Sequence, residues 1–286
     1  MPLERIALLD DLSADDRARV RLAIVADPDP EDLSRLPALE WVHSTWAGVE
    51  RMVAELAPDL PIVRLTDPQL ADTMAEAVLA AVLWLHRHGP RYARQQRARV
   101  WKAHDIPQPF ERRVTILGLG KLGSHAAEKL GANGFAVSGW SRTPKPEAAI
   151  PCYHGVEGMR AALDADIVVS LLPRTTETER IMDAEAFATM PRGSAFVNFG
   201  RGATVDEAAL VDALDRGHIA DAVLDVFATE PLPDDHPFWT NERVTVWPHV
   251  SAPTNERTAA AVIADAVCRW RDTGDMPVAV NRGRGY

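Results

Sequence analysis

Cysteine is scarce in this chain, and long apolar runs are missing. The two cysteines, Cys152 and Cys268, form no Cys-x-x-Cys pair, which argues against a disulfide framework and against a structural zinc site. The longest clean apolar run, Ala77–Leu85, is far shorter than the roughly 20 residues of a membrane helix. Charges at Glu4 and Arg5 interrupt the start of the chain, which therefore does not resemble a signal peptide. We expect a cytoplasmic protein with reduced thiols and no membrane partner.

Positive charge is also in deficit. The chain has 31 Lys and Arg against 41 Asp and Glu, a formal charge of −10, which disfavours a nucleic-acid partner. The one basic run, from Arg87 to Lys102, is interpreted as a solvated or subunit-facing helix flank. With 286 residues, 47% of them hydrophobic, the chain is long enough for about two globular domains.

The first part of the chain has the pattern of a small α/β unit. Strands are predicted at Ile6–Leu9, Trp41–His43 and Ile62–Leu65, with a helical pattern over residues 11–24. A nearly all-apolar helix is predicted over 72–88, buried between domains or against another subunit and ended by Gly89-Pro90.

From Val114 onwards the pattern becomes regular. Helical segments, such as Lys121–Ala132 and a helix capped by Thr204 or Asp206, alternate with short buried strands. Six strands are predicted, at Val114–Leu117, Phe135–Trp140, Ile167–Leu171, Ala195–Val197, Ala222–Val226 and Val244–Val246. This alternation predicts an α/β protein with a doubly wound parallel sheet.

A last helical segment, Asn255–Asp272, is expected to fold back onto the first unit. We therefore predict two domains with a cleft between them. The smaller domain comprises residues 1–88 with 258–286, and the larger domain, which contains the doubly wound sheet, comprises residues 89–257.

A glycine-rich loop follows the first strand of the regular part. Gly118, Gly120 and Gly123 have G-x-G-x-x-G spacing at the start of a helix, with Lys121 and Leu122 between the last two. Such a loop turns tightly, lets a pyrophosphate approach the backbone and places it at the helix N-terminus. A glycine-rich turn without a ligand is the alternative.

The turn after the second strand indicates which dinucleotide is bound. Ser141, Arg142 and Thr143 stand where NAD-binding folds usually place an acid for the ribose hydroxyl. A guanidinium with hydroxyl neighbours suits a 2′-phosphate, so NADPH is predicted in preference to NADH. The alternative is an arginine in a surface turn beside Pro144. The turn after the third strand, beginning Leu172-Pro173, is also assigned to the cofactor site.

Four charged or titratable residues follow the last three strands: Arg201, Asp225, Glu230 and His249. In a parallel sheet these positions share one edge. An arginine binds a carboxylate through two hydrogen bonds, a histidine donates a proton near neutrality, and a glutamate favours the protonated imidazole. Arg201, Glu230 and His249 therefore predict metal-free reduction of a 2-oxo acid. Any one of them alone could be structural.

Four stretches, GLGKLG, NFGRGATVDEAAL, LDVFATEPLP and PHVSAPT, resemble the signatures of the D-isomer-specific 2-hydroxyacid dehydrogenase family. The WSRTPK turn and the NRGRGY ending are most similar to its glyoxylate/hydroxypyruvate reductases. The resemblance implies that Arg201 binds the substrate carboxylate, Glu230 pairs with the proton donor His249, and Asp225 holds the nicotinamide carboxamide.

The resemblance implies that residues 89–257 form a Rossmann NAD(P)-binding domain and that residues 1–88 with 258–286 form a flavodoxin-like substrate domain. It implies two more features. The stretch Trp46-Ala47-Gly48 is similar to a loop whose amides at Ala47 and Gly48 cradle the substrate carboxylate, with Trp46 lining the pocket. The apolar helix near 75–85 and the polar segment after it are similar to a dimer arm, which implies a homodimer.

The expected reaction is therefore NADPH-dependent reduction of glyoxylate to glycolate and of hydroxypyruvate to D-glycerate. Two alternatives remain. One is a reductase for a bulkier 2-oxo acid. The other is a dinucleotide-sensing binding protein without activity.

Overall fold

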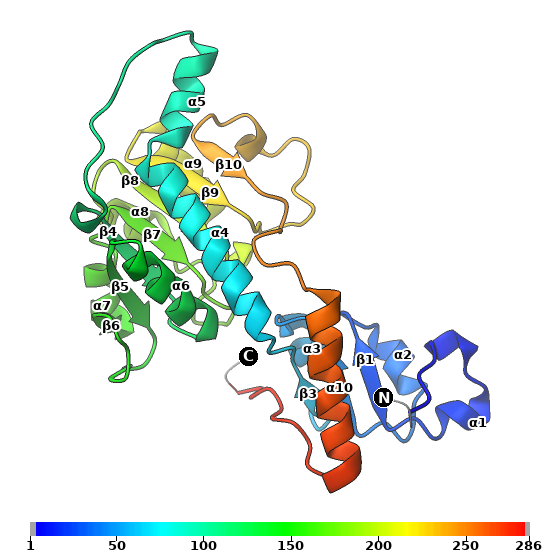
Figure 1. The fold of residues 1–286 in the computed structure, drawn as a ribbon. Helices are drawn as coiled ribbons and strands as arrows, with labels where there is room; N and C mark the ends of the chain where they lie inside the picture. The colour runs from blue at the N-terminus through cyan, green and yellow to red at the C-terminus, as the bar shows by residue number, and fades with distance from the viewer. Residues whose placement is uncertain (1–3, 284–286) are drawn as a thin grey trace. The chain divides into compact units, whose positions relative to one another are not determined.

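The computed structural model describes residues 4–283, so the last residues of the NRGRGY ending lie outside the described range. The chain separates into two compact units, one of residues 1–69 with 254–286 and one of residues 70–253. Figure 1 shows the course of the chain through both. The predicted α/β class with two parallel sheets is confirmed.

The larger unit is built on a parallel sheet of seven strands, ordered β10-β9-β8-β7-β4-β5-β6. This is the doubly wound order, which winds outward in both directions from the first strand of the unit. The strands are β4 (Arg113–Leu117), β5 (Ala136–Ser141), β6 (Cys152–His154), β7 (Ile167–Ser170), β8 (Ser194–Asn198), β9 (Ile219–Leu224) and β10 (Val244–Val246). All six predicted strands are present, and the prediction missed only the three-residue β6.

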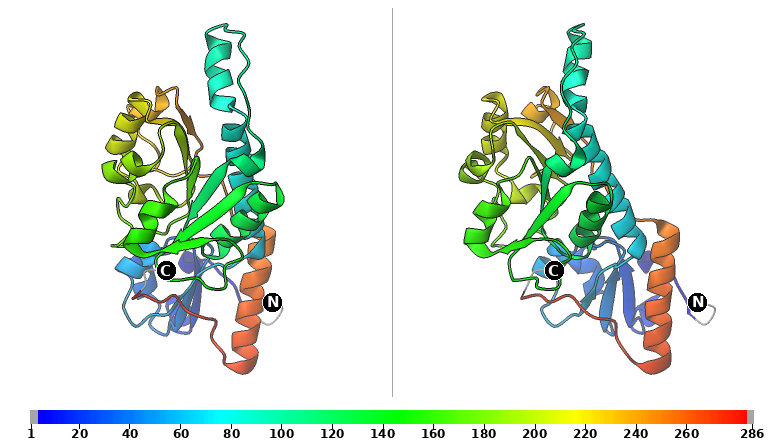
Figure 2. Two further views of the ribbon diagram at one scale, coloured as in Figure 1. Left: turned by 90° about the vertical axis from the view of Figure 1, so that its left-hand side faces the viewer. Right: turned by 60° about the vertical axis from the view of Figure 1, so that its left-hand side comes forward.

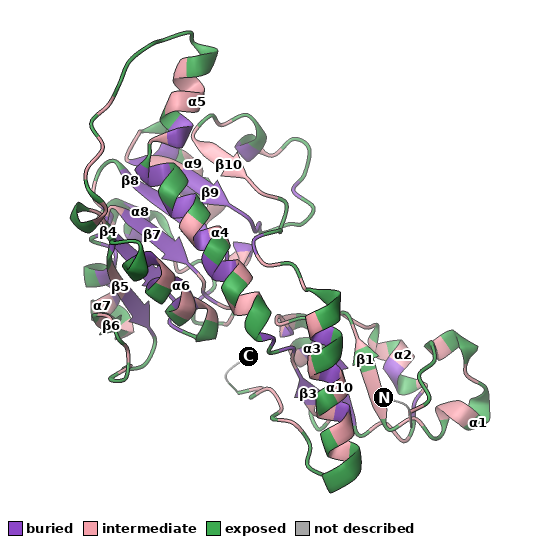
Figure 3. Ribbon diagram, in the orientation of Figure 1, coloured by how far each residue is buried: buried purple, intermediate pink, exposed green. Residues whose placement is uncertain are grey.

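Helices cover both faces of this sheet because alternate strand residues point to opposite sides. On β7, for example, Ile167 and Val169 pack with one helix layer and Val168 packs with the other. One layer contains α4 (Pro68–His86) and α6 (Lys121–Ala132), and the other contains α7 (Gly155–Ala162), α8 (Ala184–Thr189) and α9 (Glu207–Asp215). Figure 3 shows the central strands β4, β7, β8 and β9 between them as mostly buried.

A helix that the sequence analysis did not predict follows α4. α4 ends at His86, two residues before the predicted end, and Gly89-Pro90 begins α5 (Gly89–Arg97), because proline is well tolerated in the first turn of a helix. Figure 2 shows α5 and the segment after it projecting from the rest of their unit. Arg94 of α5 pairs with Asp221 of β9 at 2.5 Å, and Arg97 lies 3.4 Å from Glu242. Part of the basic run therefore binds acids of the same unit.

The smaller unit has a three-stranded parallel sheet in the order β1-β2-β3. Its strands are β1 (Leu22–Val25), β2 (Trp41–Ser44) and β3 (Ile62–Val63). Its helices are η1 (Leu9–Asp11), α1 (Ala14–Arg17), α2 (Pro30–Ser34), α3 (Glu50–Glu55) and α10 (Glu256–Thr273). The last helix packs its buried residues Ala259, Ile263 and Val267 against Leu65, so it folds back onto this unit as predicted.

The N-terminal predictions were wrong in two places. Residues 6–9 form no strand, and Ile6 and Leu8 are exposed. The strand lies instead at Leu22–Val25, inside the segment predicted as a helix, and pairs with Trp41–Ser44. The helix is limited to Ala14–Arg17. Whether such a short segment forms a strand depends on its pairing with a neighbouring strand, and the local sequence pattern does not reveal that pairing.

The unit boundaries also differ from the predicted domain boundaries. The structure divides the chain at 69/70 and 253/254, whereas the sequence placed the boundaries after residues 88 and 257. Nearly all of α4 therefore belongs to the larger unit, because Met74, Val78 and Val82 pack in the same cluster as β4 and β7.

No helix within residues 4–283 is long and apolar enough to cross a membrane.

Candidate active site

The carboxyl ends of the seven strands meet at one edge of the larger sheet, because all the strands are parallel. Every predicted site residue of this unit lies at the end of one of these strands, in the loop that follows it, or at the start of α6. The glycine loop follows β4, Ser141 ends β5, Arg201 follows β8, and His249 follows β10. The predicted cofactor and catalytic groups therefore occupy the edge where doubly wound sheets bind their ligands.

The glycine loop has the geometry that a dinucleotide requires. Gly118 has a φ of +100°, which favours glycine. At Gly123, a Cβ would lie 2.0 Å from the carbonyl oxygen of Gly118, so only glycine allows α6 to start this close to β4. A Cβ at Gly120 would meet nothing within 4 Å, and Gly120 is the N-cap of α6. The loop thus leaves open space at a helix N-terminus, as a pyrophosphate needs.

The turn after β5 places a cation at the same edge. The Ser141 hydroxyl donates to the carbonyl oxygen of Thr143 at 2.6 Å, which stabilises the turn. Arg142 pairs with Glu177, and its side chain is 41% exposed. A guanidinium at this position fits the 2′-phosphate of NADP(H). The sequence prediction did not include Glu177.

The other predicted cofactor residues surround the glycine loop. Lys121 is exposed and Leu122 packs in the cluster of α4 and α6. Leu172 is buried directly after β7, and the carbonyl oxygen of Pro173 accepts a hydrogen bond of 2.6 Å from the Thr178 hydroxyl.

Glu230 and His249 form a direct pair. Oε2 of Glu230 lies 2.7 Å from Nδ1 of His249, and Oε1 of Glu230 accepts the backbone N–H of Phe227 at 2.9 Å. Because Nδ1 faces the carboxylate, Nε2 is the imidazole nitrogen available to a substrate. The His249 side chain is about half exposed, so that nitrogen is accessible.

The charges around this pair shift both pKa values. The hydrogen bond and the charge of Glu230 raise the pKa of His249, with Asp225 adding to the rise while burial and Arg201 oppose it. Burial acts to raise the pKa of Glu230, but the hydrogen bonds from His249 and the Phe227 N–H outweigh it and lower that pKa. The pair therefore favours an imidazolium beside a carboxylate.

Arg201 belongs to the same cluster, because its charge acts on both Glu230 and His249. Two side chains hold its backbone: the Asn198 amide and the Thr204 hydroxyl donate to the Arg201 carbonyl oxygen at 3.1 and 2.7 Å. Its Nη1 donates to the carbonyl oxygen of Gly200 at 2.8 Å. Asn198 was not among the predicted residues. The sequence feature that could have identified Asn198 is a polar residue at the end of a buried strand.

Asp225 anchors the histidine loop. Its side chain is fully buried, and its two oxygens accept the backbone N–H groups of Val250 and Ser251 at 2.7 and 3.0 Å. Its carbonyl oxygen accepts the N–H of His249, which has a φ of +54°. The sequence did not predict this anchoring role. The contact of Asp225 with a nicotinamide carboxamide stays a prediction.

The loop Trp46-Ala47-Gly48 lies in the smaller unit, directly after β2. Trp46 is about half exposed. Its N–H donates to the Ser44 hydroxyl at 3.0 Å, and its carbonyl oxygen accepts the N–H of Leu65 at 3.1 Å. These bonds define the loop, and its role in substrate binding stays a prediction.

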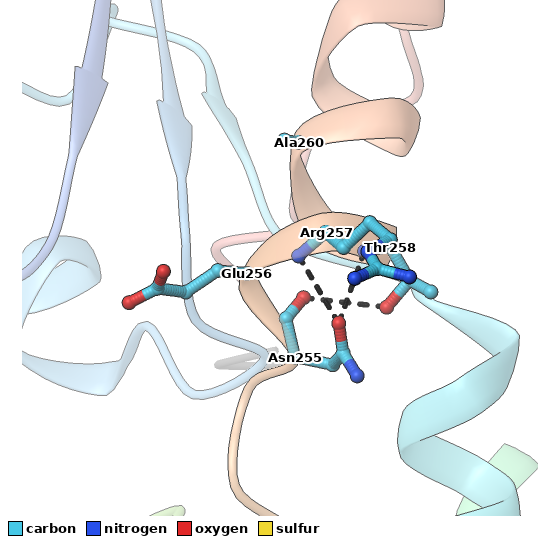
Figure 4. A pocket seen from close by; sticks show the side chains of 5 residues that line it. All are labelled: Asn255, Glu256, Arg257, Thr258 and Ala260. Carbon is cyan, nitrogen blue, oxygen red and sulfur yellow. Dashed lines mark hydrogen bonds between the residues drawn. The ribbon is translucent and has the colours of Figure 1, made fainter.

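A pocket in the smaller unit lies over the first turn of α10, lined by Asn255, Glu256, Arg257, Thr258 and Ala260. Figure 4 shows that the Asn255 side chain accepts the backbone N–H groups that begin the helix. This pocket is lined by a single helical turn whose asparagine already serves as the cap, so we assign no chemistry to it.

The fold and the site define a dinucleotide-dependent oxidoreductase. The chain belongs to the D-isomer specific 2-hydroxyacid dehydrogenase family, whose NAD-binding domain model matches residues 79–251. The family prediction is confirmed.

Among curated relatives, the glyoxylate/hydroxypyruvate reductase A of Serratia proteamaculans (strain 568) is 36% identical over 266 residues, which cover 90% of this chain and 85% of the relative. A D-isomer specific 2-hydroxyacid dehydrogenase from Xanthobacter autotrophicus Py2, solved with NADPH and MES, has a TM-score of 0.90 and 43% identity, covering 95% of this chain and 87% of the other. The NADPH-dependent glyoxylate/hydroxypyruvate reductase from Sinorhizobium meliloti, solved with NADP and sulfate, has a TM-score of 0.89 and 33% identity, covering 97% and 90%.

Replacing Gly123 tests the glycine loop. In Gly123→Ala the new methyl group would collide with the Gly118 carbonyl, so the loop must move. We expect NADPH affinity to fall by at least about tenfold, or about 1.4 kcal/mol, measured by fluorescence titration of the cofactor.

Gly131→Ala is the matched control, because Gly131 lies on the same helix and a Cβ there would meet nothing within 4 Å. This variant should bind NADPH like the wild type and gain about 0.5–1 kcal/mol in stability. Equal affinities for the two variants would contradict the assigned role of Gly123.

Proposed function

We propose that this protein is an NADPH-dependent reductase of small 2-oxo acids, converting glyoxylate to glycolate and hydroxypyruvate to D-glycerate. The observation that carries the proposal is the cluster of Arg201, Glu230 and His249 at the sheet edge that also bears the glycine loop. The named activity of the Serratia relative and the cofactor of the Xanthobacter structure support it.

Each residue of the cluster has a distinct role in the proposed reaction. The planar guanidinium of Arg201 binds the substrate carboxylate through two hydrogen bonds and so orients the neighbouring carbonyl. His249 donates a proton from Nε2 to the carbonyl oxygen, and Glu230 holds the imidazole through Nδ1 and stabilises its charged form. Bound NADPH supplies the hydride that reduces the carbonyl carbon, which yields a 2-hydroxy acid without a metal.

The cofactor assignment rests on two features of the chain. The glycine loop holds the pyrophosphate, with Lys121 and Leu122 at the start of α6 and Leu172-Pro173 beside the loop. Arg142, with Ser141 and Thr143 in the same turn, binds the 2′-phosphate and so favours NADPH over NADH. Asp225 holds the nicotinamide carboxamide, and Trp46, Ala47 and Gly48 contribute to substrate binding in the same proposal.

We further propose a homodimer formed through α4, α5 and the segment that follows. Figures 1 and 2 show the far end of α5 and the segment after it projecting beyond the rest of their unit. Large apolar side chains are exposed along this arm: Leu83 and Trp84 on α4, then Val100 and Trp101 after α5. Trp101 is fully exposed in the single chain, which is costly for so large an apolar surface. A second copy of the chain covers it in our proposal. A cytoplasmic location completes the proposal, consistent with the free thiols of Cys152 and Cys268.

The activity is tested with a panel of 2-oxo acids of increasing size, each assayed with NADPH and with NADH. We expect glyoxylate and hydroxypyruvate to have the highest kcat/KM, and NADPH to have a KM at least about tenfold below that of NADH, equivalent to about 1.4 kcal/mol. Higher kcat/KM for phenylpyruvate would favour the bulkier-substrate alternative. Cofactor binding without turnover of any acid would favour a dinucleotide sensor.

The proton donor is tested by the pH dependence of reduction. His249 must be protonated to act, so kcat/KM should fall as pH rises through its pKa, which Glu230 raises. In Glu230→Gln the carboxylate is lost and that fall should move to lower pH. His249→Asn should lower kcat by at least about 100-fold. An unchanged pH profile in Glu230→Gln would remove this carboxylate from the proposal.

The dimer is tested by sedimentation equilibrium at micromolar concentration. We expect twice the chain mass of 31.3 kDa. Trp101→Glu places a charge on the exposed arm and should shift the protein towards the monomer, whereas Trp239→Glu, at another exposed tryptophan, should not. A wild-type mass of one chain would contradict the proposal.

A further inference from the structure

Glu207 contacts the chain segment that contains Glu230 but has no role in the reaction as described so far. It is the first residue of α9, and its side chain is only 20% exposed. Its Oε1 accepts the backbone N–H of Ala228 at 2.9 Å. Ala228 belongs to the segment between β9 and Glu230, so Glu207 reaches from one loop of the site to another.

The two peptide units that flank Phe227 are both held by contacts within the site. In the first, the N–H of Phe227 donates to Oε1 of Glu230, which fixes the carboxylate that pairs with His249. Against the second, between Phe227 and Ala228, lies Gly202, where a Cβ would come within 1.9 Å of the Phe227 carbonyl carbon. Gly202 directly follows Arg201. The loop that carries Arg201 and the loop that carries Glu230 therefore meet at the peptide between Phe227 and Ala228.

The second oxygen of Glu207 faces His236. Oε2 lies 3.4 Å from Nε2 of His236, whose side chain is 18% exposed. Nδ1 of His236 accepts the backbone N–H of Phe238 at 3.3 Å, so in the neutral ring the proton is on Nε2, towards Glu207. Both carboxylate oxygens of Glu207 thus bind the segment that runs from Ala228 to His236, which contains Glu230.

We propose that Glu207 is a positioning residue that holds the Phe227–Ala228 peptide, so that the neighbouring N–H of Phe227 stays in place to bind Glu230 and Glu230 stays in hydrogen-bond contact with His249. The roles of Glu230 and His249 rest on the proposed function, but the contacts of Glu207 do not. Glu207 acts on His249 only through Glu230, and it touches no reacting atom.

The proposal is tested by NMR titration of the histidine side chains in the full-length protein, without substrate or cofactor. The groups acting on His249 are Glu230, Asp225 and Arg201, and none of them is changed by a substitution at Glu207. If Glu207 holds Glu230 in place, Glu207→Ala should lower the pKa of His249 by at least about half a unit, a threefold change in the protonation equilibrium. The signal of His249 is assigned by its loss in His249→Asn.

Three further variants distinguish a positioning role of Glu207 from a general loss of structure. Glu207→Gln keeps an oxygen that can accept the Ala228 N–H and loses only the acceptor that faces His236, so the His249 pKa should stay close to that of the wild type. In Glu207→Asp the side chain is one methylene too short, so this variant should also lower the His249 pKa. It replaces Glu207→Ala as the test if that variant does not fold. Asp212→Ala, on the same helix, removes an acid that pairs with Arg216, and should change nothing.

Steady-state kinetics supply the second measurement. Glu207→Ala should lower kcat about tenfold and move the fall of kcat/KM to lower pH, with the KM for NADPH within about twofold of the wild-type value. An unchanged His249 pKa in both Glu207→Ala and Glu207→Asp would overturn the proposal. A His249 pKa that is as low in Glu207→Gln as in Glu207→Ala would also overturn it. If the wild type reduces no 2-oxo acid, the proposed function fails, while the titration still decides the role of Glu207.

Discussion

Parallel pairing of β8, β9 and β10 is the constraint on which the rest of the site depends. Three strands that run the same way must end at the same edge, so the loops with Arg201, Glu230 and His249 all leave the sheet there. The sheet fixes only where these loops begin. Backbone hydrogen bonds to Asp225 and Glu230, together with the close approach at Gly202, then fix where the side chains point.

The electrostatics of the site follow from hydrogen bonds between a few charged groups. Most ion pairs of the described residues lie on the exposed surface, where each contributes little. In the pair of Glu230 and His249, hydrogen bonding outweighs the opposing effect of burial: Glu230 raises the pKa of His249, while His249 and the N–H of Phe227 lower the pKa of Glu230. A chain with a formal charge of −10 can therefore still present cations to an anionic ligand, at Arg142 and Arg201.

Some elements of this chain are predictable from their own sequence, whereas others depend on which partner they pack against. Six of the seven strands of the larger unit were predicted because each is a short apolar run, and α6 was predicted with its exact ends because glycines mark its start. The N-terminal strand was predicted at the wrong place because Ile6–Leu9 and Leu22–Val25 are both short apolar segments, and only the second pairs with β2. The boundary at the start of the larger unit differs from the predicted one for a similar reason. The apolar face of α4 could pack against several partners, and in the structure it packs on the larger sheet.

The sequence by itself determined the fold class, the family, the glycine loop and the identity of Arg201, Glu230 and His249 as candidate residues, because these are encoded in local spacing and in the order of the motifs. Only the tertiary structure decided that Asp225 anchors the histidine loop, that Glu177 lies beside Arg142, and that Glu207 and Gly202 hold the segment leading to Glu230. These contacts join residues on different loops, and their distances depend on how the strands pair and the helices pack. No local pattern carries that information.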